Sequence, residues 1–407
     1  MQSKKNLLVC MPDFPFPARK NGISIRYYPI LEHAAKKFNI HLLIIAEGKV
    51  GQEAILEAKQ FCEKISVHTR TPKNVSTFKK LTYRTKSLIP YTLPFDLIRY
   101  DEKDIETFIA QETKNTIYDN ALCVLLSYQH LVKKVVQANR YVIDFIDSPY
   151  STSFRKKGRS LLKAYDSFLL KLWERKTINA LDYACYVSPL DRKLGAGINL
   201  NEEKIGVIPN GLYLNDFSEE KIDFGCNTIG YLGHMGYPPN IKAALRLYSI
   251  FKTHCLKLPN TKLVIIGRDP SPEITALAAD KNVIITGTVE NIWPYINGVD
   301  LFVFPMEIGS GQQNKLLEAM AAGIPVISTE LGNSGIGATH NEEIIIANSN
   351  QEIGNSMVSL LQDNQRRQRI GITGKKFITG NYYWPSILNI IDTKLLRTNH
   401  TNPNYPI

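Results

Sequence analysis

The chain has 407 residues, of which 44% are hydrophobic and 21% charged, so it is expected to form two soluble globular domains. These values exclude a disordered chain, and no apolar run is long enough to span a bilayer. The net charge of +11 is uneven, because residues 1–215 hold 33 Lys and Arg against 21 Asp and Glu, whereas residues 216–407 hold 16 against 17. This asymmetry predicts an anionic partner for the first half: membrane lipid, a phosphorylated acceptor or nucleic acid.

The N-terminus does not read as a secretory signal. Lys4 and Lys5 precede an apolar segment that runs only from 7 to 11 before Pro12 and Asp13 interrupt it. We therefore expect a cytoplasmic protein.

The first 70 residues alternate apolar runs with helical patterns, as a doubly wound parallel sheet does. Strands are predicted at 7–11, 40–46 and 66–68, and helices at 25–38 and 54–65. The pattern fails between 71 and 100, where basic and aromatic side chains are interleaved. This segment suits either an acceptor- or membrane-facing loop or a plain solvated insertion.

Alternation returns after residue 101. The predicted elements are a helix at 102–112, a strand at 121–127, a helix at 131–137, a strand at 141–146 and strands at 183–187 and 204–208. Asp147 ends one of these strands, where open α/β sheets bind ligands, although it can equally cap the following loop. His130 follows the preceding strand and could reach the same site, or could be a structural histidine.

A long basic amphipathic helix is predicted over 153–176. It could lie on anionic lipid, or bury its apolar stripe in its own domain and expose its lysines. The polar stretch 213–223 is the expected linker to the second half.

The second half is predicted to be another doubly wound domain. Its expected strands are 228–232, 263–266, 283–286, 301–304 and 326–328. Four of these strands are followed by glycine, at Gly233, Gly267, Gly287 and Gly309. Parallel topology places such strand ends along one edge of the sheet.

The stretch 301–329 carries the strongest local signal. A glycine-rich loop, residues 309–311, precedes a helix that begins near 313 or 314, so free amide groups point at one place. Lys315 adds positive charge in the first helical turn, and Glu318 lies on the same face one turn later. The pattern predicts an anion site with a hydroxyl-binding carboxylate; an ordinary strand-loop-helix with a surface ion pair gives the same pattern.

The order of the motifs resembles the retaining glycosyltransferases of family 4 (glycosyl transferases group 1). The resemblance rests on motifs spread over nearly the whole chain: DYACYVS at 182–188, IPNGL at 208–212, YLGHMGYPPN at 231–240, IIGRDP at 265–270, ITGTV at 285–289 and GSGQQNKLLEAMAAGIPVIST at 309–329. It implies the GT-B fold, an α/β architecture of two Rossmann-like doubly wound parallel-sheet domains. The acceptor domain would be 1–212 and the nucleotide-sugar domain 213–384, with 385–407 forming a helix that crosses back and a tail.

The resemblance also assigns roles to residues. Glu318 matches the second glutamate of the family's E-x7-E motif, which binds ribose, whereas Ser310 stands where the first glutamate is usual. Glu307, or the backbone amides of 309–311, would replace it. Lys315 and Arg268 would neutralise the diphosphate, and Asp147 lies near the position of an active-site histidine. The expected catalytic residues are thus Lys315, Arg268, Glu307 and Asp147. The expected donor-binding residues are Gly233, His234, Gly236, Gly287, Val289, Gly309, Ser310, Gly311, Asn314, Lys315 and Glu318. The expected acceptor-binding residues are Gly22, Arg26, His130 and Asp147.

The expected function is transfer of a sugar, with retention, from a nucleotide-diphosphate donor to a saccharide or lipid-linked acceptor in cell-surface polysaccharide assembly. No metal or cofactor is expected, and the basic half would contact the inner membrane face. The alternatives are a GT-B nucleotide-sugar epimerase, which would need more acid and base groups, and a non-catalytic sugar-nucleotide-binding protein, suggested by Ser310. Nucleic acid is not an expected partner, because no binding motif for it occurs.

Overall fold

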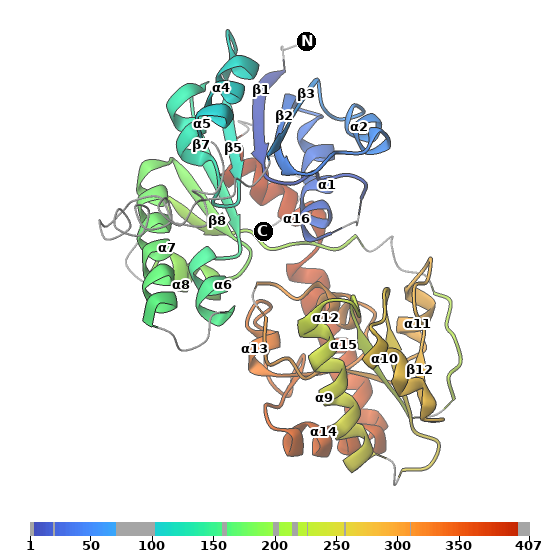
Figure 1. Cartoon of the computed structure of the whole chain (residues 1–407). Coiled ribbons are helices and arrows are strands. Elements are labelled where there is room, and N and C mark those ends of the chain that lie inside the picture. Colours follow the sequence, from blue (N-terminus) through green and yellow to red (C-terminus); the bar gives the residue numbers. More distant parts are fainter. Residues whose placement is uncertain are drawn as a thin grey trace. The chain divides into compact units, whose positions relative to one another are not determined.

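The computed structural model describes residues 4–18, 21–70, 102–156, 161–197, 203–213, 219–225, 227–255, 258–309 and 311–397. The chain divides into two compact units (Figure 1). The first unit comprises Met1–Asn210 with Pro385–Ile407, and the second comprises Gly211–Trp384. Ser310 and the basic aromatic segment 71–100 lie outside the described residues.

A seven-stranded parallel sheet forms the centre of the first unit, in the order β3-β2-β1-β5-β7-β8-β9. The strands are β1 (Lys5–Met11), β2 (Phe38–Glu47), β3 (Lys64–Arg70), β5 (Asn120–Val124), β7 (Tyr141–Ile146), β8 (Tyr183–Tyr186) and β9 (Ile205–Val207). A short parallel pair, β4 (Ile117–Tyr118) with β6 (Gln137–Ala138), forms a separate two-stranded sheet. Runs such as Leu7, Leu8 and Val9 are buried throughout, as expected for strands whose two faces are both covered.

The helices of this unit are α1 (Gly22–Ala34), α2 (Gln52–Ala58), α4 (Glu102–Thr113), α5 (Gln129–Val135), α6 (Pro149–Lys156), α7 (Leu161–Ala180) and α8 (Pro189–Gly195). The prediction of one helix over 153–176 is wrong, because α6 and α7 are separate helices packed against each other (Figure 1). Ser153 Oγ lies 3.0 Å from Ser167 Oγ, whereas fourteen residues of one continuous helix would separate them by about 21 Å.

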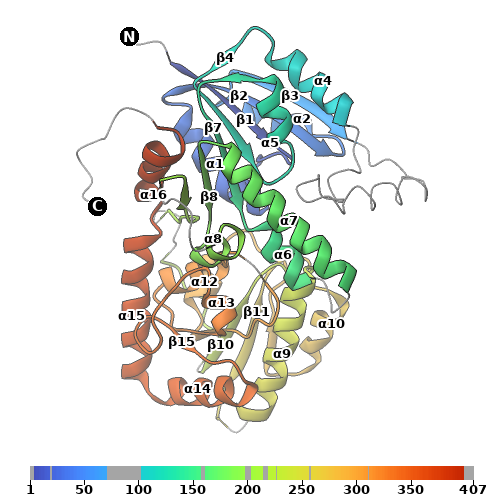
Figure 2. The ribbon, with the colours of Figure 1, turned by 90° about the vertical axis from the view of Figure 1, so that its left-hand side faces the viewer.

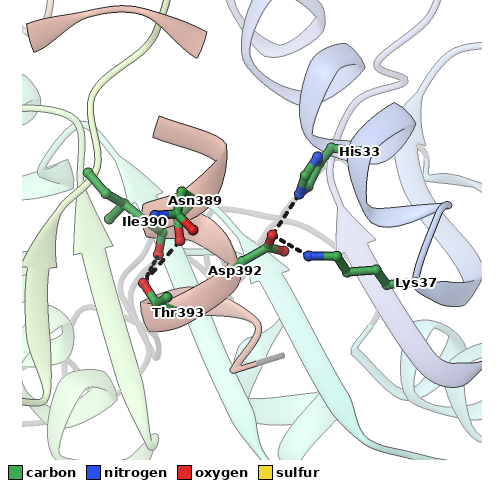
Figure 3. Close-up of polar contacts among 6 residues, drawn as sticks. All are labelled: His33, Lys37, Asn389, Ile390, Asp392 and Thr393. Carbon is green, nitrogen blue, oxygen red and sulfur yellow. Dashed lines mark hydrogen bonds and ion pairs between the residues drawn. The ribbon is translucent and has the colours of Figure 1, made fainter. Parts of the chain in front are cut away.

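The C-terminal segment packs on the first unit. It consists of α16 (Trp384–Ile390) and a π-helical turn, Ile391–Leu395. Asp392 Oδ2 accepts from His33 Nε2 at 2.8 Å and from Lys37 Nζ at 2.5 Å, so two side chains of the α1 region hold this turn (Figure 3). Asn120 Nδ2 also donates to the Leu396 carbonyl at 2.9 Å, and Arg140 Nη2 donates to the Lys394 carbonyl at 2.8 Å.

The second unit contains a six-stranded parallel sheet in the order β12-β11-β10-β13-β14-β15. The strands are β10 (Thr228–Leu232), β11 (Lys262–Ile266), β12 (Val283–Ile285), β13 (Leu301–Phe304), β14 (Val326–Ser328) and β15 (Ile345–Ile346). In chain order this is 3-2-1-4-5-6, the arrangement of the doubly wound dinucleotide-binding fold. Both sheets are parallel and doubly wound, as predicted.

The helices of the second unit are α9 (Pro238–His254), α10 (Pro272–Thr275), α11 (Trp293–Asn297), α12 (Asn314–Ala321), α13 (Glu330–Asn333), α14 (Asn350–Gln362) and α15 (Asn364–Asn381). Sequence reasoning did not place α14 and α15, which meet at a short junction (Figure 2). Their start signals are nevertheless present: Ser349 and Glu352 form a capping box, and the Asp363 side chain caps α15. Within the described ranges, none of the helices is both long and apolar enough to cross a membrane.

Candidate functional site

The centre of the second sheet is the point at which its strand order reverses. β10 and β13 are neighbours, and the chain leaves them towards opposite sides of the sheet. In open parallel sheets, ligands bind beyond the carboxyl ends of the strands at this point. The loop from β10 to α9 and the loop from β13 to α12 are therefore the two segments that flank the candidate site.

Lys315, the second residue of α12, reaches across this point. Its Nζ donates to Asn240 Oδ1 at 2.6 Å and lies 3.4 Å from the Tyr231 hydroxyl. The same ammonium stands over the rings of Tyr231 and Phe304, at 5.4 and 5.9 Å from their centroids. Burial lowers the pKa of Lys315 to about 7, because a charged amine is poorly solvated there.

Asn240 joins α9 to the rest of the site. Its Nδ2 donates to the His234 carbonyl at 3.0 Å, and its Oδ1 accepts from the Tyr231 hydroxyl at 3.3 Å. In the sequence Asn240 appears only as the last residue of the motif at 231–240, and this role was missed. The one available signal was its place at the end of the GHMGYPPN motif, directly after two prolines that open the helix.

Two glycines of these loops lie in close contacts, Gly267 against backbone and Gly233 against the Asn240 side chain. Gly267 has φ +155°, and a Cβ atom there would lie 1.7 Å from the Gly233 carbonyl oxygen. A Cβ on Gly233 would in turn lie 2.9 Å from Asn240 Nδ2. The loops after β10 and β11 thus touch each other, and larger residues would force them apart.

The loop after β11 brings Arg268 towards the His234 loop. The Met235 amide donates to the Arg268 carbonyl at 2.9 Å, and His234 Nε2 lies 3.0 Å from Asp269 Oδ2. Arg268 Nε lies 3.8 Å from the same carboxylate and is half exposed. Gly236 is close by, since a Cβ there would lie 3.2 Å from the Asp269 carbonyl oxygen. The structure therefore gathers Gly233, His234, Gly236 and Arg268 beside each other.

The remaining donor-site predictions lie on the same sheet edge. Asn314 begins α12, and Glu318 is half-buried on that helix, one turn after Lys315. Gly309 and Gly311 precede α12, and Gly311 has φ +67°. Gly287, with φ +67°, and Val289 follow β12, which is two strands away from β10.

Glu307 forms an ion pair with Arg246. Its Oε1 lies 3.7 Å from Arg246 Nε on α9, and Arg246 also donates to the Pro305 and Asn348 carbonyls at 3.1 and 2.7 Å. Arg246 lies six residues after Asn240, about 9 Å further along the helix axis. The Glu307 side chain is 62% exposed, so this ion pair lies at the protein surface.

In the first unit, Gly22 is the first residue of α1, and Arg26 is completely buried one turn later. Arg26 Nε donates to Asp144 Oδ2 at 2.6 Å, and Nη1 donates to Asn210 Oδ1 at 3.0 Å. Burial alone would lower the pKa of Arg26, but the Asp144 carboxylate outweighs burial and raises it. In this structure Arg26 thus ties α1 to β7 in the interior, a position that sequence reasoning did not foresee.

Asp147 follows a distorted strand end. The register of β7 against β8 shifts between Asp144 and Ile146, and Ile146 has φ +60° although it is β-branched. Such a conformation costs free energy and re-aims the next side chain. It is an independent structural reason to keep Asp147 as a candidate.

His130 lies elsewhere in the first unit. Its Nε2 is 3.1 Å from Glu102 Oε1, and its ring meets Trp173 edge-on with centroids 5.7 Å apart. Together with Gln129 and Lys133 it lines a cavity of about 60 Å³ between α5 and α7. The contacts of His130 join it to α4 and α7 and do not bring it to Asp147.

A buried carboxyl group that sequence reasoning missed lies on α7. Glu174 is fully buried and accepts from the Tyr186 hydroxyl at 2.7 Å, from Ser148 Oγ at 3.1 Å and from the Tyr150 amide at 3.3 Å. Burial raises the pKa of Glu174 to about 7 in spite of these donors. In the sequence it was hidden inside a basic amphipathic pattern. Over the described residues, no group of three or more His, Cys, Asp or Glu is placed to hold a metal ion.

The chain resembles known proteins in sequence. Residues 226–363 match the family model for glycosyl transferases group 1. A protein of Klebsiella pneumoniae described as an uncharacterized 44.6 kDa protein in the cps region is 25% identical over 181 residues. That alignment covers 42% of this chain and 46% of the relative, so the chain matches less than half of that relative's length.

Solved structures match along nearly the whole chain. Anabaena HepE in complex with UDP aligns with a TM-score of 0.67 at 13% identity, covering 97% of this chain and 100% of that chain. Sucrose-phosphate synthase from Thermosynechococcus elongatus aligns with a TM-score of 0.68 at 14% identity, covering 97% and 98%. The chain therefore has the GT-B fold, and its second unit carries the match that supports a relationship to glycosyl transferases group 1.

Proposed function

We propose that the protein is a retaining glycosyltransferase that moves a sugar from a nucleotide-diphosphate donor to a saccharide or lipid-linked saccharide. The observation that carries the proposal is the Lys315 ammonium at the N-terminus of α12, beside Asn240 near the N-terminus of α9. The N-terminus of α12 and the Lys315 cation at the switch point of a parallel sheet favour an anionic ligand with several oxygens, such as a diphosphate.

The similar proteins also support this proposal. The Anabaena structures that share the fold are described as complexes with UDP and with UDP-glucose. The Klebsiella relative is described by its position in a cps region, which suggests a place in capsular or other cell-surface polysaccharide assembly.

In the proposed mechanism, protein groups stabilise the negative charge that develops on the diphosphate as its bond to the sugar breaks. The diphosphate becomes a good leaving group only when preorganised donors meet its developing charge. The α12 amides and Lys315 would supply them, with Arg268 at the neighbouring loop, so the proposal needs neither a metal ion nor a cofactor. No covalent nucleophile is assigned, and departure and attack on the same face of the sugar would give retention.

We further propose that Glu318 binds the ribose hydroxyls, one helical turn from Lys315. For the transferred sugar, we favour the backbone amides of 309–311 over Glu307. The reason is that the Glu307 carboxylate is paired with Arg246 on α9.

The acceptor would be bound by the first unit, with Asp147 as its leading candidate residue because of the distorted strand end before it. We also propose peripheral contact with an anionic membrane. Leu161 and Phe168 of α7 are 89% and 51% exposed, and residues 1–215 carry the surplus of positive charge.

A thermal-shift screen tests the donor proposal first. UDP, GDP and dTDP, and their glucose conjugates, would each be added to the full chain, because a ligand that binds only the native state raises its unfolding temperature. We expect one base to give a clear shift. If none of the nucleotides shifts or binds, the proposed donor site is wrong.

Incubation with the selected nucleotide sugar then separates the functions. Formation of a different nucleotide sugar without acceptor would identify an epimerase. Slow donor hydrolysis, or transfer to an added saccharide, would support the transferase. Tight binding with neither reaction would identify a non-catalytic binding protein.

Membrane contact is tested by sedimentation with vesicles that contain phosphatidylglycerol. Phe168→Ser should lower the bound fraction several-fold at low salt. Ile372→Ser is the matched control, since Ile372 is 56% exposed but lies on α15 of the second unit. Equal loss for both variants, or binding to neutral vesicles alone, contradicts this part of the proposal.

A further inference from the structure

The amide of Asn240 is held in one orientation by its surroundings. Nδ2 donates to the His234 carbonyl at 3.0 Å, so Oδ1 must face the Lys315 ammonium, 2.6 Å away. The Tyr231 hydroxyl donates to the same Oδ1 at 3.3 Å. Asn240 is only 9% exposed and Tyr231 is completely buried, so this arrangement is shielded from competing water.

The position of the Lys315 ammonium is fixed by its contacts. Beneath it lie the rings of Tyr231 and Phe304, and among the described residues its oxygen contacts are Asn240 Oδ1 and the Tyr231 hydroxyl. A lysine side chain is flexible and loses considerable rotamer freedom when it is fixed in this way. A well-placed hydrogen-bond acceptor is therefore needed to hold Nζ at the point where the strand order of the sheet reverses.

The hydrogen-bond acceptor of Lys315, the Asn240 amide oxygen, carries no net charge. The charge of the cluster is therefore that of the lysine. Throughout the described part of the chain, Lys315 forms no ion pair with a carboxylate, so the positive charge of its protonated form is not cancelled. An aspartate has the same shape as asparagine but would neutralise the ammonium. An amide positions the cation and leaves its charge available to an incoming anion.

We propose that Asn240 is a positioning residue of the donor site: it holds the Lys315 ammonium at the junction of α9 and α12, and its neutrality keeps that charge available for the donor's diphosphate. This inference rests on the proposed function, because it names the residue that prepares the same site.

The test uses four variants of the full chain: Asn240→Asp, Asn240→Ala, Lys315→Met and the double variant Asn240→Ala with Lys315→Met. The ligand is the nucleoside diphosphate that gives the largest shift in the screen of UDP, GDP and dTDP. Its dissociation constant is measured by titration calorimetry. The pKa of Lys315 is measured without ligand by NMR of ¹³C-labelled lysine Cε atoms, with Lys315→Met identifying the resonance. Thermal unfolding confirms that each variant folds.

We expect Asn240→Asp to raise the pKa of Lys315 by about one unit or more, since an opposite charge then faces Nζ. The same variant should weaken nucleotide binding by about 10-fold or more, because the new carboxylate competes with the diphosphate. Asn240→Ala should weaken binding by about 3- to 10-fold with Lys315 present, and have almost no effect in the Lys315→Met background.

Two results would overturn the inference. One is an unchanged Lys315 pKa in Asn240→Asp. The other is an equal loss of affinity from Asn240→Ala with and without Lys315, which would show a purely structural role. Failure of the proposed function looks different, since the unmodified chain would then bind none of the three nucleotides. Should Asn240→Asp fail to fold, the Asn240→Ala and Lys315→Met cycle still decides between the outcomes.

Discussion

Removal of the Lys315 ammonium is the most direct test of the proposed chemistry. The perturbation is Lys315→Ala, with Lys315→Met as a second variant that keeps most of the side-chain volume over the Tyr231 and Phe304 rings. Loss of one preorganised donor to a developing oxyanion typically slows an enzyme by about 10²-fold or more. A 10²-fold loss corresponds to about 2.7 kcal/mol of transition-state stabilisation.

The assay is sugar transfer at saturating donor, with the nucleotide sugar selected by thermal shift. The effect should appear in kcat and not only in KM, because the ammonium meets charge that develops as the sugar departs. Lys376→Ala is a matched control, since Lys376 is an exposed lysine on α15 of the same unit. If turnover of both Lys315 variants at saturating donor equals that of the unmodified chain, the assignment of Lys315 is refuted.

Three further predictions concern stability. Because burial lowers the pKa of Lys315 from 10.5 to about 7, the unfolded state binds more protons between these values, and the unfolding free energy should rise with pH across that window. Lys315→Met should remove this part of the slope in urea titrations; an unchanged slope would contradict the burial of the amine. Because burial raises the pKa of Glu174 from 4.5 to about 7, the folded state binds more protons in between, so the unfolding free energy should fall as pH rises from 4.5 to 7. Glu174→Gln should flatten that fall, and a pH profile that matches the unmodified chain would argue against it. Asp392→Asn should lower the Tm by about 2–4 °C in calorimetry, since the contacts to His33 and Lys37 weaken. Burial alone would raise the pKa of Asp392, but these two partners lower it, so this stabilisation should disappear as pH falls through the acidic range below 3.8.

The regular elements of the second unit could be read from the sequence because their signals are local. The predicted strands 228–232, 301–304 and 326–328 coincide with β10, β13 and β14. The predicted start of a helix near 313 or 314 is confirmed by α12, which begins at Asn314. Gly323 follows that helix with φ +82°, the left-handed conformation in which glycine commonly ends a helix.

The contact between Asn240 and Lys315 could not be predicted, because 75 residues separate them and the pairing of β10 with β13 brings them together. The fully buried state of Glu174 was equally hidden, since the two residues that follow it, Arg175 and Lys176, are basic. The separation of α6 from α7 depends on how the two helices pack. In each case the decisive interaction is tertiary and leaves no periodic trace in the sequence.

The C-terminal turn described above has a practical consequence for dissecting the protein. The first unit is not a continuous stretch of chain, because Pro385–Ile407 belongs with Met1–Asn210. A fragment that stops at residue 210 would leave Arg140 without the Lys394 carbonyl and Asn120 without the Leu396 carbonyl. It would also uncover the surface that buries Ile391 and Leu395. Separate production of the two halves should therefore succeed best with a circularly permuted chain, in which the C-terminal segment is joined ahead of the first strand.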